Sequence, residues 1–75
     1  MNDPTNTDRA MWAQAAVTTF AEITRMDSAG EDDETIMADL LADLMHLAES
    51  KDIDWAATLE RATGHYEYEK EHDEP

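Results

Sequence analysis

Two clusters of acidic and histidine side chains are the residues of this chain whose types and spacing could do chemistry. Asp39, Asp43 and His46 recur at intervals of four and three within the apolar run DDETIMADLLADLMHLAES. Carboxylate oxygens and an imidazole nitrogen are ligands that suit several divalent cations. Residues three and four apart also share one face of a helix, so the same spacing is typical of a solvated helical surface.

The second cluster lies in GHYEYEKEH, close to the C-terminal end. His65, Glu69 and His72 share a helical face, and Glu69 with His72 makes the Glu-x-x-His spacing of di-iron carboxylate proteins. Those proteins use the motif twice on helices that face a bundle interior, whereas this chain has it once. Each cluster offers ligands from one side of one helix, so we expect neither cluster to bind a metal ion.

Other kinds of catalytic site find no support in the sequence. The chain has no cysteine, which excludes a thiolate nucleophile, a disulfide framework and a cysteine metal site. It has no glycine-rich loop for phosphate and no nucleophile elbow. A chain of 75 residues also leaves little room for an enclosed cleft beside its core. We therefore expect no enzymatic activity and no cofactor.

Hydrophobic periodicity predicts three helices that position these residues. The first should run over about residues 8 to 26 after a cap at Thr7, and the second over about residues 34 to 50. The third should span about residues 54 to 69, with Asp52 or Asp54 as its cap. Their apolar stripes are expected to pack through six large side chains, which are Trp12, Phe20, Leu40, Leu44, Trp55 and Leu59.

The predicted fold is all-α, a small three-helix bundle that self-associates. Residues 1–7 are expected to form a disordered N-terminal tail, residues 8–69 the three-helix domain, and residues 70–75 a frayed acidic C-terminal tail. So short a chain gains only a few kcal/mol from its own core. A homodimer is therefore expected, and alanines on the first helix would permit close packing of a second subunit there: Ala13, Ala15, Ala16 and Ala21.

Charge restricts the partners more strongly than any motif does. Nineteen acidic residues against five basic ones give a net charge of -14. Direct binding to nucleic acid or to an anionic membrane is thereby disfavoured, and a partner should present a basic protein surface. The N-terminal end is polar, and nowhere do about 18 apolar residues run together. The sequence therefore indicates a soluble, cytoplasmic protein.

The segment ADLLADLMHLAESKDIDWAATLERA, residues 38 to 62, resembles the last two helices of MazG-like nucleotide pyrophosphohydrolases. In that family a Glu-x-x-Asp on this helix and a Glu-Glu-x-x-Glu on the preceding helix bind magnesium. Asp39 matches the aspartate, but Ile36 stands three positions earlier and the first helix offers only Glu22. The resemblance implies a helix pair, and a degenerate nucleotide-binding helical protein is one alternative for the function.

The pattern DLLADLMHLAES, IDW, LERA and HYEYE is similar to a group of short bacterial proteins associated with phages and mobile elements. This similarity extends over residues 33 to 69 and includes His46, Trp55, His65 and Tyr66. A small acidic helical protein of that kind resembles anti-CRISPR and anti-restriction inhibitors, which often occupy the nucleic-acid groove of a defence enzyme. The resemblance implies an acidic inhibitor that mimics DNA.

Acidic side chains along the last two helices could satisfy the lysines and arginines of such a groove. Acids one turn apart on a helix are separated by about 5 to 6 Å, a spacing close to that of a phosphate ladder. A salt-adapted or housekeeping acidic domain would carry similar charge without a partner, and that alternative stays open. The candidate interaction surface consists of Glu31, Asp32, Asp33, Asp39, Asp43, Glu60, Glu67, Glu69 and Glu71.

Overall fold

A computed structural model describes residues 4–73 and confirms the all-α fold with three helices. The helices are α1 (Asn6–Thr24), α2 (Asp33–Ser50) and α3 (Trp55–Glu71). The helix α1 begins and ends two residues earlier than the periodicity indicates, and α3 extends two residues further. The tails were expected at residues 1–7 and 70–75, but residues 6–7 belong to α1 and residues 70–71 to α3. Residues 1–3 and 74–75 lie outside the described residues.

Side-chain caps fix where each helix begins. Thr5, and not Thr7 as expected, caps α1 in a capping box, where its hydroxyl accepts from the Asp8 N–H and the Asp8 carboxylate accepts from the Thr5 N–H. Asp32 caps α2 through the Thr35 N–H at 2.9 Å. Asp54 caps α3 through the Ala57 N–H at 3.1 Å. Each cap satisfies a backbone donor that a helix start leaves free.

Left-handed residues end the first two helices. Arg25 has φ 64° after α1, and Asp52 has φ 59° after α2. In each case the N–H of the next residue, Met26 or Ile53, donates a hydrogen bond to a carbonyl oxygen in the last turn of the helix. Asp52 therefore ends α2, and Asp54 is the residue that caps α3.

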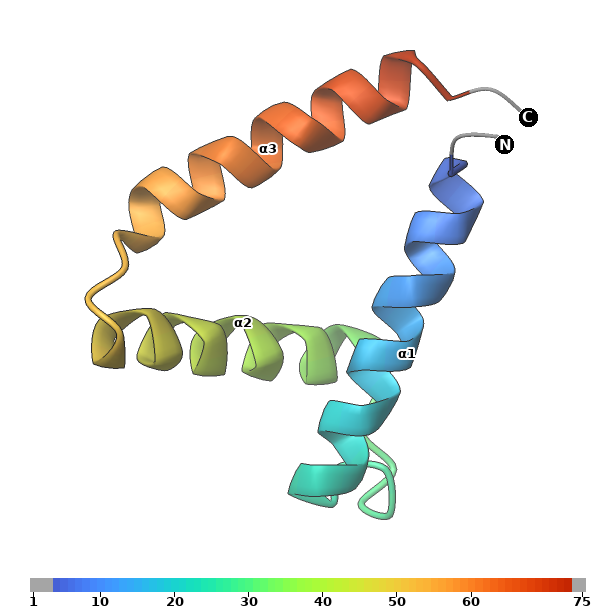
Figure 1. Ribbon diagram of the computed structural model, residues 1–75. Helices are drawn as coiled ribbons and strands as arrows, with labels where there is room; N and C mark the ends of the chain where they lie inside the picture. The colour runs from blue at the N-terminus through green and yellow to red at the C-terminus, as the bar shows by residue number, and fades with distance from the viewer. Residues whose placement is uncertain (1–3, 74–75) are drawn as a thin grey trace.

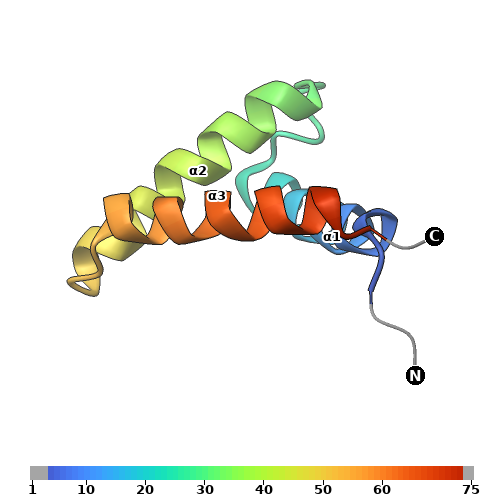
Figure 2. The same cartoon turned by 90° about the horizontal axis from the view of Figure 1, so that it is seen from above.

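The three helices form an open triangle (Figure 1). The helix α2 is its base, α1 packs across the N-terminal end of α2, and α3 leaves from the other end of α2 and returns toward the start of α1. Seen from above, α3 passes in front of α2 and ends near the beginning of α1 (Figure 2). There Asn6 donates to Asp73 and to the Glu69 carbonyl, at 2.9 and 2.8 Å.

The core is small and lies where α1 crosses α2. Val17 and Ala21 of α1 pack there against Ile36 of α2, and all three are buried. Phe20, Met26 and Leu40 are partly buried around them. Within residues 4–73 the one other buried side chain is Ala48, near the end of α2.

Half of the six side chains expected in the core lie on the surface. Phe20, Leu40 and Trp55 are half-buried, whereas Leu44 and Leu59 are exposed and Trp12 is 61% exposed. The expectation was wrong for these three because the helices meet near their ends and do not pack along their lengths. Ala21, expected to face a second subunit, instead lies beneath α2.

Replacing each of the two glycines by alanine should change the free energy of unfolding in opposite directions. Gly30 has φ +74° in the connection between α1 and α2, where alanine should lower the free energy of unfolding by about 1 kcal/mol. Gly64 lies within α3, where alanine should raise the free energy of unfolding by about 0.5 to 1 kcal/mol. Beyond the adjoining residues and the local helix backbone, no atom lies within 4 Å of the position that a Cβ would take at either glycine, so backbone preference alone decides. Urea unfolding of both variants measures the difference, and equal signs would contradict the left-handed turn.

Candidate functional site

The residues of the candidate acidic surface lie on α2, on its approach and on α3. Glu31, Asp32 and Asp33 gather at the N-terminal end of α2, where the helix dipole favours negative charge. Asp39 and Asp43 follow about two and three turns further along. All five are exposed, and no lysine or arginine occurs among the residues from Glu31 to Ser50, which include seven acids. The helix α2 therefore carries negative charge that its own sequence does not neutralise.

Asp32 has a structural role within this surface. Hydrogen bonds from the Thr35 side chain and from the Thr35 N–H stabilise its carboxylate and lower the pKa of Asp32 below the ordinary value of 3.8. The charge of Asp32 is consequently retained to lower pH than that of a free aspartate. Because this carboxylate is occupied as a helix cap, it is less free than Asp39 or Asp43 to meet a partner.

The acids of α3 fall into two groups. Glu60, Glu67 and Glu71 are exposed. Glu69 is half-buried, and its Oε2 lies 3.2 Å from the Arg9 Nε, the one salt bridge found between residues 4 and 73. This pair neutralises Glu69 locally, so a partner meets mainly the other three acids of α3.

Two residues of the C-terminal cluster, Glu69 and His72, are engaged in other contacts. Glu69 pairs with Arg9, while the His72 ring stacks on Tyr68 at 3.9 Å and its Nδ1 lies 2.7 Å from the Tyr68 carbonyl oxygen. Across the described part of the chain, no three His, Asp or Glu side chains come together as a metal site requires. The structure thus brings neither cluster into a closed ligand set.

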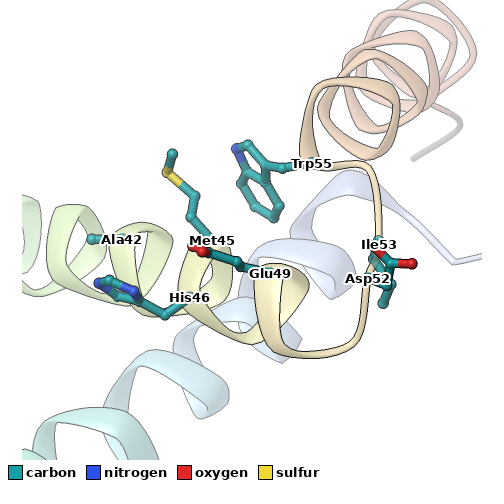
Figure 3. A pocket seen from close by; sticks show the side chains of 7 residues that line it. All are labelled: Ala42, Met45, His46, Glu49, Asp52, Ile53 and Trp55. Carbon is teal, nitrogen blue, oxygen red and sulfur yellow. The ribbon is translucent and has the colours of Figure 1, made fainter.

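A hollow that sequence reasoning did not single out lies between the C-terminal end of α2 and the start of α3. Its volume is about 550 Å³, and the side chains of Met45 and Trp55 lie next to each other in its wall (Figure 3). His46, the residue after Met45 on α2, also lines the hollow (Figure 3). The remaining lining comes from Ala42, Glu49, Asp52 and Ile53. The wall is mainly apolar, and three titratable side chains, His46, Glu49 and Asp52, stand at its rim.

Comparison with known proteins finds no matching family model, no matching curated protein and no matching solved structure. None of the helices in residues 4–73 combines the length and the apolar character that crossing a bilayer requires. The charge and the exposed surfaces of the chain itself are therefore the features that bear on its function.

Proposed function

We propose that this chain is an acidic protein-interaction module that occupies the basic, nucleic-acid-binding groove of another protein. The exposed acids of α2, held on a helix that contains no lysine or arginine, are the observation that carries the proposal. Asp39 and Asp43 are one turn apart, a spacing at which like charges destabilise an isolated helix by about 0.2 to 0.5 kcal/mol. A basic partner would remove that repulsion on binding.

The arrangement of the other acids extends the same reasoning. Glu31 and Asp33 stand at one end of α2, and the exposed glutamates of α3 form a second line of charge. Carboxylates fixed on helices present a defined pattern to lysines and arginines, and complementary charge of this kind speeds association. An inhibitor of a host defence protein, as the resemblance to anti-CRISPR and anti-restriction proteins implies, is one form that such a module would take.

Short duplex DNA should displace this chain from its partner. The partner is first captured from a host extract on the immobilised full chain at low salt, and is then challenged with short duplex DNA. Displacement by the duplex is expected, because both ligands would occupy one groove. A partner that binds DNA and this chain together would contradict mimicry.

The purified partner then allows a matched comparison of two double variants. Asp39→Lys with Asp43→Lys should lower the association rate constant by at least about 10-fold and flatten its salt dependence. Glu22→Lys with Asp27→Lys makes the same change in net charge outside α2 and α3 and should have a much smaller effect. Equal effects of the two double variants would favour bulk acidity, as in a salt-adapted domain, over a defined binding surface.

A further inference from the structure

A stripe of exposed apolar side chains follows α2 on the side opposite Asp39 and Asp43. Leu41 is 49% exposed, and Met37, Leu44 and Met45 are exposed beside it. At about 100° per residue, Leu41 lies about 160° around the helix from both Asp39 and Asp43. The core contacts of α2 use a different face, that of Ile36 and Leu40. Apart from Met45, which lies beside Trp55 of α3, the stripe is therefore a surface that neither the core nor the acidic surface uses.

The chain as a whole exposes more surface than a compact monomer of its mass. The accessible surface is 6356 Å² for a mass of 8.5 kDa. A folded monomer of that mass is expected to expose about 4,700 Å². The excess of about 1,700 Å² per chain is spread over the whole open fold, and covering half of it on each of two chains would bury about 1,700 Å² in total, the size of a standard interface.

We infer that the cover is a second copy of this chain, packed against the apolar stripe of α2. The four apolar side chains carry no charge, and Glu34, one turn before Met37, is the one acid that continues their face. A basic partner would therefore gain little electrostatic complementarity from the stripe, whereas a second copy offers an equal apolar stripe. A twofold interface of this kind is self-complementary, since the same patch serves both chains. Trp12 of α1 and Leu59 of α3 add further exposed apolar area that a dimer can enclose.

This dimer leaves the acidic surface free. Because Asp39 and Asp43 lie on the far side of α2 from Leu41, each chain keeps its acids toward solvent. Two chains of net charge -14 repel one another, so added salt should strengthen the dimer by screening. Binding to a basic groove weakens with salt, and the two interactions can therefore be told apart.

Sedimentation equilibrium of the full chain tests the inference directly. The expected mass is twice 8.5 kDa, and the dissociation constant should fall as sodium chloride is added. A monomer at all concentrations up to about 200 µM, at low and high salt, would overturn the inference whatever the outcome with a basic partner.

Two matched variants locate the interface. Leu41→Glu should weaken the dimer by at least about 30-fold, while Ala42→Glu, which adds the same charge about 100° around α2, should change it much less. Leu41→Gln serves as a second disrupting variant without added charge, and circular dichroism checks that each variant keeps its helices. Folded Leu41 variants that dimerise as well as the original chain would place the interface elsewhere and contradict the inference. If both Leu41 variants unfold, the mass of the original chain decides.

Discussion

Truncation of Ile36 to alanine should lower the free energy of unfolding by about 2 to 5 kcal/mol. Ile36 is only 5% exposed and packs against Val17 and Ala21, with Phe20 and Leu40 beside them. Removing its outer carbons loses burial energy and leaves a cavity that the two crossing helices cannot fill without shifting. Since the core is so small, this single change should leave much of the chain unfolded at 37 °C.

The chain provides its own control in a second isoleucine. Ile23 belongs to α1, one of the two crossing helices, but its side chain is 75% exposed. Ile23→Ala should therefore change the free energy of unfolding by no more than about 0.5 kcal/mol. Urea unfolding followed by circular dichroism, at one fixed protein concentration, gives both values. Equal losses from the two isoleucines would show that the crossing of α1 and α2 is not the centre of the core.

Enlarging Ala21 to leucine should lower the free energy of unfolding by about 1 to 3 kcal/mol. Ala21 is buried beneath α2, and its small side chain is what allows the backbones of α1 and α2 to approach. A leucine there must adopt a strained rotamer or push the helices apart. The cost is steric, in contrast to the cavity that Ile36→Ala creates.

Ala16→Leu is the matched control, because Ala16 is an exposed alanine of the same helix. It should change the free energy of unfolding by no more than about 0.5 kcal/mol. Thermal unfolding of the two variants at equal concentration makes the comparison. A gain in stability from Ala21→Leu would show that the crossing holds unfilled space, and would remove close approach as the reason for alanine at this position.

The helices themselves were predictable, because short-range patterns determine them. Apolar residues at spacings of three and four identified all three, and the boundaries of α2 and α3 fall within two residues of expectation. The cap of α1 was expected at Thr7, but Thr5 is the capping residue. Asp8 decides the position, because its carboxylate accepts a hydrogen bond from the Thr5 N–H and so completes the capping box.

The packing was not predictable in the same way. A stripe indicates which face of a helix is apolar but does not fix where two helices cross, so Trp12, Leu44 and Leu59 were placed in a core that they do not join. The exposed positions of Asp39 and Asp43 did follow from the stripe, because they lie away from it. The pairing of Glu69 with Arg9 joins residues 60 positions apart, and no local pattern indicates it.

The contacts that close the triangle also bear on the order in which the chain folds. Asn6 bonds to Glu69 and Asp73 across separations of 63 and 67 residues, whereas α1 and α2 meet through a short connection. The entropy lost on closing a loop grows with its length, so the α1 and α2 pair should form first and the two ends should meet last. The closing contacts are partly exposed, and a surface ion pair contributes only about 0 to 1 kcal/mol. The third helix should therefore detach as a unit in brief openings during which the first two stay packed, and its amides should exchange with solvent sooner than those around Ile36.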